Sequence, residues 1–209
     1  LMLEGPYDAG LGRMRDDLRA ASLIPTTEPF TALGFTQVGG GGGETVLPAV
    51  FTTTGDNAIV DWVLVELRSA VTPSTIVATR SALVQRDGDV VGTNAISPVL
   101  FNSPAGSYYV SVRHRNHFGC MTAAPLTLTG APAVVDLTLS TTATYGTDAR
   151  KDLGGIQGLW TGNVTMDTEL LYTGAGNDRD PILQAIGGVV PTNSITGYRM
   201  EDTNLDGAV

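Results

Sequence analysis

The chain has 209 residues and a formal net charge of −9, and only 16% of its residues are charged. This acidic balance argues against a nucleic-acid partner, because contact with the phosphate backbone needs clustered basic side chains. No apolar run reaches the length of a membrane span, and a single cysteine excludes an internal disulfide. The abundance of glycine, threonine, valine and alanine is typical of extracellular β-proteins with many turns.

Residues 1–45 are expected to form an N-terminal segment with one helix and a glycine-rich linker. The stretch 12–21 predicts the helix, because its apolar residues recur at helical spacing. The five glycines at 39–43 predict a linker or an exposed loop, since ordering them within an element costs too much conformational entropy. The first residues do not resemble a signal peptide. A cytoplasmic protein would lack one, and so would a mature or internal fragment. Because the sequence starts with leucine, we expect a mature or internal part of a longer polypeptide.

Residues 46–140 carry the pattern of an antiparallel β-domain. The stretch 58–68 is apolar on both faces at its centre, as an inner strand should be, and Asp87-Gly88 predicts a hairpin turn. The expected strands cover 58–68, 76–85, 90–91, 107–115, 125–129 and 134–139. This spacing of short strands predicts an immunoglobulin-like or prealbumin-like sandwich. Its core should include Trp62, Leu64, Val110 and Val112.

One group of residues in this domain has the spacing of metal ligands. His114, His117 and Cys120 follow one another at intervals of three. On an extended strand the two histidines would point to opposite faces, and structural zinc usually needs a fourth ligand that is not apparent here. We expect ordinary histidines at a strand end and a buried thiol at Cys120.

A short motif occurs twice in the last third of the chain, with starts 39 residues apart. Oxygen-bearing side chains occupy its first, third and fifth positions, and an aliphatic residue occupies its eighth. These oxygen-bearing residues are Asn163, Thr165 and Asp167 in the first copy and Asp202, Asn204 and Asp206 in the second. Alternate side chains of a tight loop can converge on one hard cation, so the motif predicts EF-hand or dockerin-like loops that bind Ca²⁺.

The closing ligand of each loop is less regular. In the first copy the Glu169 carbonyl would contribute, but the standard closing position is Gly174, which has no side chain. A short insertion would bring up Asp178 or Asp180 instead, and the sequence leaves that choice open. Asp180 also precedes Pro181, so it is expected to be the N-cap of a short helix over 181–186. The alternative is that these acids only cap the helix and line a turn.

The second copy has the glycine that the sharp turn prefers, Gly207, at its sixth position, where the first copy has Thr168. The printed sequence reaches Val209 before any acidic residue could close this copy. We therefore expect the second loop to be completed by further sequence or by an adjoining subunit.

Several segments after residue 145 resemble the C-terminal region of large secreted Bacteroidota proteins, often labelled haemagglutinin-like. The matching segments are Asp148–Gly155, Gly158–Asn163, Tyr172–Leu183 and Ile186–Asn193. The resemblance covers about a third of the chain with high specificity. It implies an exported surface or matrix protein, and in that family the Asn-Asp-Arg-Asp element recurs further along. Residues 141–209 are thus expected to be a dockerin-like calcium-binding region.

These observations favour a non-enzymatic, secreted or cell-surface protein that serves as a calcium-stabilised subunit of a fibre or matrix. A homo-oligomer or filament is expected, since sheet edges without protection can pair with a second copy. One alternative is a module that binds a carbohydrate or a surface protein, including a cohesin-like partner. Another is the accessory region of a secreted enzyme.

Overall fold

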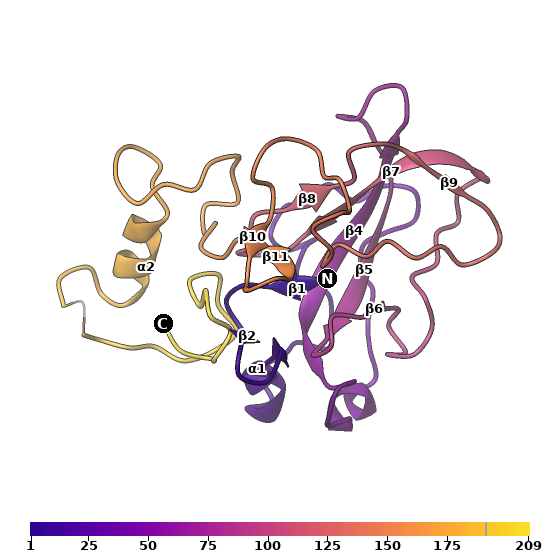
Figure 1. The fold of residues 1–209 in the computed structure, drawn as a ribbon. Helices are drawn as coiled ribbons and strands as arrows, with labels where there is room; N and C mark the ends of the chain where they lie inside the picture. Colours follow the sequence, from indigo (N-terminus) through magenta and orange to yellow (C-terminus); the bar gives the residue numbers. More distant parts are fainter. Residues whose placement is uncertain (191) are drawn as a thin grey trace.

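The computed structural model describes residues 1–190 and 192–209, and it is mainly β with several small sheets and few helices (Figure 1). The largest sheet has the strand order β6-β5-β4-β7-β8, with β9 also paired to β7. Its strands are β4 (Ile59–Ser69), β5 (Ile76–Gln85), β6 (Val90–Val91), β7 (Gly106–Arg113), β8 (Cys120–Met121) and β9 (Leu126–Leu128). All pairs in this sheet are antiparallel. The prediction of a mainly antiparallel β-domain is confirmed.

Strand β4 lies at the centre of the sheet because its sequence can be buried on both faces. Nine consecutive residues from Ile59 to Leu67 are buried. Strand β5 pairs along Ile59–Arg68 and β7 along Leu64–Ser69, so the second half of β4 has backbone partners on both edges. The prediction of buried Trp62, Leu64, Val110 and Val112 is confirmed.

One face of the sheet is covered by the N-terminal segment. The Trp62 indole donates to the Pro25 carbonyl oxygen at 2.9 Å, and the Arg113 guanidinium lies over the Phe35 ring. The expected helix over 12–21 is reduced to α1 (Asp17–Ala20), because Arg13–Met14 form a strand instead. This strand, β3, pairs with β2 (Tyr7–Asp8). Tertiary pairing has here overridden the local helical spacing.

The glycine run lies on the surface but is packed along β5 rather than free of the domain. The Thr79 amide donates to the Val38 carbonyl oxygen at 2.9 Å. A Cβ atom added to Gly41 would lie 2.4 Å from the Thr79 carbonyl oxygen, and one on Gly39 would lie 2.7 Å from the Ala78 Cβ. Glycine is therefore required for this close approach. The segment also covers the middle of the outer edge of β5, so the expectation of unprotected sheet edges is not met there.

The other face of the sheet packs against both ends of the chain. Strand β1 (Met2–Leu3) pairs in parallel with β11 (Gln157–Leu159), which also pairs with β10 (Lys151–Asp152). Leu3, Leu159 and Leu205 are fully buried in the same core cluster as β4. The segment that ends at Val209 runs beside β2 and α1 (Figure 1). The C-terminal region thus packs against the sheet and shares its core, rather than forming a separate appendage.

Two further elements complete the described structure. A 3-10 helix, η1, spans Pro48–Thr52, and helix α2 spans Arg179–Ala185, which confirms the short helix expected near 181–186. The expected strand over 134–139 does not form, because the Asp136 carboxylate accepts hydrogen bonds from the Thr138 amide and hydroxyl and bends the chain. Among the described residues, no helix combines the length and apolar character needed to cross a membrane.

Candidate calcium loops and a buried polar network

The first loop gathers three of its predicted ligands. The Thr165 hydroxyl donates to Asp178 Oδ1 at 2.9 Å, and the Thr165 amide donates to the same oxygen at 3.1 Å. Asn163 Oδ1 lies 3.5 Å from the Thr165 hydroxyl, while Asp178 Oδ2 accepts from the Leu171 amide. Both Asn163 and Asp178 are buried. A carboxylate, an amide oxygen and a hydroxyl therefore face one another at this point.

The structure separates the two acids that the sequence left as alternatives. Asp178 turns into the loop, whereas Asp180 accepts from the Asn177 side chain and pairs with the Arg179 guanidinium at 3.0 Å. Asp178 also occupies the N-cap position of α2, and Asp180 lies in the first turn of that helix. The expectation that Asp180 is the N-cap is wrong, because the helix begins two residues earlier than Pro181.

Another predicted ligand of the first loop, Asp167, points elsewhere. The Asp167 carboxylate accepts from the Glu169 amide at 2.8 Å, so it closes its own turn. The Asp167 carbonyl oxygen accepts from the Asn163 side chain at 3.1 Å. Glu169, whose carbonyl is the other expected ligand, is exposed. Asp167 would have to rotate its side chain to join Asn163, Thr165 and Asp178.

The second loop brings its three oxygen-bearing side chains around one turn. The Asp202 carboxylate accepts from the amides of Asp206, at 3.2 Å, and Gly207, at 2.9 Å. The Asn204 side chain donates to Asp206 Oδ2 at 2.8 Å. Asp202 is almost fully buried, and this burial raises the pKa of its carboxyl group above the ordinary value. A cation at this turn would offset the cost of burying that charge.

Both copies share one unusual backbone feature. Met166 and Leu205 occupy the fourth position of their copies, and each has a φ angle of 58°. Bulky residues rarely adopt positive φ values, so the same departure at the same position marks a common loop geometry. Gly207 adds a φ of 88° at the sixth position of the second copy, as its residue type predicts.

The donor atoms of these loops are hard oxygens of mixed type. Within residues 1–190 and 192–209, no three His, Cys, Asp or Glu side chains converge to form a metal-binding group. The first loop has one inward carboxylate with an amide and a hydroxyl, and the second has two carboxylates with an amide. Ca²⁺ accepts such ligands together with backbone carbonyls and water, and each carboxylate adds to its affinity. The donor chemistry therefore fits Ca²⁺, with few charges in the first loop.

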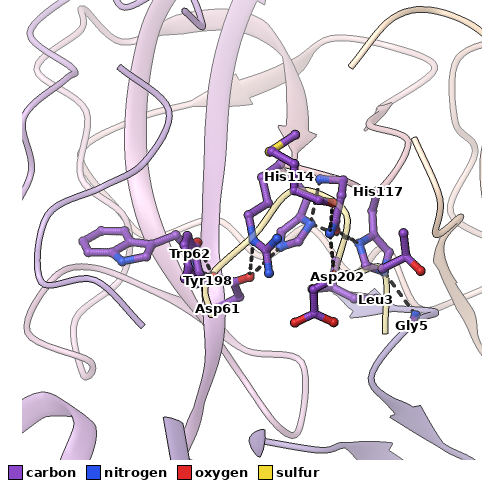
Figure 2. Close-up of polar contacts among 12 residues, drawn as sticks. Leu3, Gly5, Asp61, Trp62, His114, His117, Tyr198 and Asp202 are labelled. Carbon is purple, nitrogen blue, oxygen red and sulfur yellow. Dashed lines mark hydrogen bonds and ion pairs between the residues drawn. The ribbon is translucent and has the colours of Figure 1, made fainter. Parts of the chain in front are cut away.

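A second concentration of polar groups lies inside the molecule, and reasoning from the sequence did not identify it. Asp61 on β4 is fully buried, and its carboxylate accepts from the Trp62 amide, the Tyr198 hydroxyl, Arg115 Nε and His114 Nε2 (Figure 2). Burial alone would raise its pKa, but the Arg115 charge and these hydrogen bonds outweigh burial and lower the pKa to about 2. The available signal was an acid, Asp61, within the otherwise apolar half of the strand from Ile59 to Val65.

The two histidines belong to this network. Strand β7 ends at Arg113, so His114 and His117 are not on an extended strand, and their Nδ1 atoms lie 3.0 Å apart. The condition under which they would point to opposite faces, an extended strand through both residues, is therefore not met. Cys120 instead pairs with Val112 in the sheet, and burial raises the pKa of its thiol to about 11. It is the buried thiol that the sequence predicted.

The network fastens the entry to the second loop. The Asn116 side chain donates to the carbonyl oxygens of Met200, at 2.8 Å, and Asp202, at 2.6 Å. Arg15 donates to the Asn204 carbonyl oxygen at 3.2 Å. Gly5 packs so tightly on Thr203 that an added Cβ would meet its carbonyl oxygen at 2.0 Å. Side chains from the sheet and the N-terminal segment thus hold the backbone of residues 200–204.

The fold and these loops define a mainly antiparallel β-protein with two related oxygen-lined turns. Comparison of the chain with protein-family models, curated proteins and solved structures found no match.

Proposed function

We propose that this chain is a non-enzymatic extracellular structural or adhesive protein, a subunit of a surface fibre or matrix whose C-terminal loops bind Ca²⁺. The observation that carries the proposal is the repeated turn: two copies with the same positive φ at position four and with side-chain oxygens facing one another. In the first loop Asn163, Thr165 and Asp178 would hold the ion, joined by Asp167. In the second, Asp202, Asn204 and Asp206 would do so.

The small number of carboxylates supports an extracellular location. Loops with few charges bind Ca²⁺ weakly, with dissociation constants of about 10⁻⁴–10⁻³ M in extracellular modules. Only surroundings rich in calcium would fill the first loop, which has one inward carboxylate. When bound, Ca²⁺ supplies positive charge that draws the loop oxygens together and offsets the burial of Asp178 and Asp202.

The contacts of the second loop support a structural role for the ion. Residues 200–204 are held by Asn116, Arg15 and the close packing of Gly5. Stiffening of the turn at 202–207 would therefore be transmitted to the sheet and to the N-terminal segment. A subunit exposed to mechanical load gains from such a connection between its two ends.

The experiment is thermal unfolding of the full chain in Ca²⁺ and in excess chelator. A gain of about 1 kcal/mol from ion binding corresponds to a rise of about 2–4 °C in melting temperature at this chain length. We expect Asp178→Asn to reduce the calcium-dependent rise and Asp180→Asn, the matched control, to leave it unchanged. Mg²⁺ should not substitute, because it demands a smaller octahedral site. An equal melting temperature in Ca²⁺ and chelator would refute the calcium proposal.

Assembly into a fibre would use surfaces other than bare strand edges. The outer edge of β5 is partly covered by β6 and by the Val38–Gly41 segment, and that of β7 by β8 and β9. We expect light scattering to detect oligomers of the full chain with Ca²⁺. A strictly monomeric species at high concentration would remove the fibre from the proposal and leave the calcium-binding surface module.

A binding module is the second candidate, and one surface feature favours it. A hollow of about 670 Å³ lies between residues 45–57 and 93–96, and Leu47 and Ile96 on its rim are 75% and 83% exposed. Exposed apolar side chains beside a hollow are typical of ligand or partner contacts. Specific glycan-array binding that is lost in the Leu47→Ser and Ile96→Ser variants would favour this function over the structural one.

A further inference from the structure

The buried histidines have a fixed direction of hydrogen bonding. His114 and His117 are the only two histidines in the chain, and both are buried. The Gly5 amide donates to His117 Nε2 at 3.1 Å. A backbone amide can only donate, so His117 Nε2 carries no proton and the neutral ring must carry its proton on Nδ1.

The same logic fixes the second ring. His117 Nδ1 faces His114 Nδ1 at 3.0 Å and Asn116 Oδ1 at 2.9 Å. His114 Nδ1 must therefore accept, and it also lies 3.4 Å from the Asn116 amide. The His114 proton is then on Nε2, which faces Asp61 Oδ2 at 3.2 Å. Hydrogen bonds run in one direction from Gly5 through both rings to Asp61 (Figure 2).

This arrangement has no place for another proton. A second proton on His117 would point at the Gly5 amide, and one on His114 would point at the proton that His117 donates. Either would set donor against donor in the interior, where a broken hydrogen bond is not replaced by water. Neutral histidines are thus a condition for the observed contacts.

The surrounding charges act in the same direction on balance. Burial lowers the pKa of both rings, and the charges of His114 and Arg115 lower the pKa of His117 further. The hydrogen bond to Asp61 opposes this effect for His114 but does not overcome it. Arg115 also faces the Tyr198 ring. Two acids on the flanking segments are engaged in other contacts: Glu4 accepts from the Thr161 amide, and Asp202 accepts from the Gly207 amide of its own loop.

The contacts of this pair join three parts of the chain. Gly5 follows β1, Asp61 lies on β4, and Asn116 holds the carbonyl oxygens of Met200 and Asp202. We propose that His114 and His117 form an acid-sensitive latch that holds residues 1–6 and 198–202 to the sheet. The latch is closed while both rings are neutral and opens when either gains a second proton.

The direction of the pH effect follows from the two states. Histidine in an unfolded chain has a pKa of about 6.5, and the folded values lie below it. The unfolded state therefore binds more protons as the pH falls below about 6.5, and stability is lost from there down through the folded pKa values. Asp202 gives the opposite sign, because its folded pKa is raised. The Leu1 amino group also has a lowered pKa in the folded state, so it reduces stability in the same direction as the histidines, starting as the pH falls below about 8.

The test measures unfolding of the full chain by denaturant between pH 7 and pH 5, without Ca²⁺, in the natural protein and in the double variant His114→Gln/His117→Gln. Glutamine offers a donor and an acceptor but does not titrate. Each pKa unit of lowering changes the unfolding equilibrium constant about tenfold. We expect an increase of about tenfold or more on acidification of the natural protein, and a much smaller change in the double variant. The same pH profile in both proteins would overturn the proposal.

Two measurements on the natural protein keep the test independent of whether the variant folds. Native-state hydrogen exchange should show protection at the Gly5 amide falling on acidification before protection in β4 and β5 does. Nitrogen NMR at pH 7 should place the protons on His117 Nδ1 and His114 Nε2. Unchanged Gly5 protection at pH 5, or the opposite tautomers, would refute the latch.

Discussion

The central sheet and the C-terminal region are held in place by different forces. Strand β4 is buried over nine consecutive residues, so apolar surface removed from water stabilises it at about 25 cal/mol per Å². Among the described residues after 160, only three apolar residues are buried, namely Val164, Ile186 and Leu205. Polar contacts and loop turns hold this region in place of a larger apolar core. The comparison indicates that the sheet supplies the fold's stability, while the C-terminal region depends on hydrogen bonds and, in our proposal, on a cation.

The largest effect is expected where the two regions meet. Replacement of Asp61 by Ala would leave the charge of Arg115 buried without its partner, which typically costs about 3–5 kcal/mol. Denaturant unfolding would measure the loss. Glu169→Gln, at an exposed acid, is the control and should change little. A cost for Asp61→Ala below that of the control would mean that the network does not join the two regions.

A cavity in the sheet should cost nearly as much, without any dependence on calcium. Leu64 is fully buried on β4, and its replacement by Ala should destabilise the protein by about 2–5 kcal/mol. Val71→Ala, at a residue that is 91% exposed, serves as the control. The cost of Leu64→Ala should be equal in Ca²⁺ and in chelator. A cost that changes with calcium would contradict the separation of the two forces.

Substitution in the glycine run should destabilise the protein where the run packs against β5. Gly41→Ala brings a Cβ into the Thr79 backbone and should cost about 1–3 kcal/mol. Gly130→Ala, with nothing within 4 Å and no positive φ, should change stability by about 0.5 kcal/mol or less. Equal melting temperatures for the two variants would show that residues 39–43 are the free linker that the sequence predicted.

The smallest effect concerns the shared kink of the calcium loops. Met166 has a positive φ, which costs a bulky residue about 1–2 kcal/mol. Met166→Gly should relieve part of this cost and leave the melting temperature in chelator equal or slightly higher, while Met2→Gly, at a buried strand residue with ordinary φ, should lower it. A marked destabilisation by Met166→Gly would show that its side chain, rather than its backbone, supports the loop.

Local sequence patterns predicted the sheet well because its determinants are local. Strand β5 has the bounds expected from its apolar run, and the Asp87-Gly88 turn forms the β5–β6 hairpin. The helix over 12–21 failed because Met14 gains a strand partner and a hydrogen bond to Arg86, contacts that no window around Met14 contains. The segment 134–139 failed because one side chain, Asp136, competes for the backbone.

The sites divide in the same way. The loop motif could be recognised in the sequence because its residues are close together in the chain. The choice between Asp178 and Asp180 as the closing ligand could be made only once the start of helix α2 was known. The buried network was not visible, because Asp61, His114 and Tyr198 come from distant parts of the chain. Asp61 gains its partners only when the sheet and both chain ends are in place.

The most direct test of the account is native-state hydrogen exchange of the full chain in about 1 mM Ca²⁺, the extracellular range, and in chelator. We expect calcium to increase protection most in the two loops, at residues 163–178 and 202–207, with a smaller increase in the segments that hold them and the least in β4 and β5. Protection in the loops that is the same with and without calcium would contradict the claim that a cation stabilises the C-terminal region.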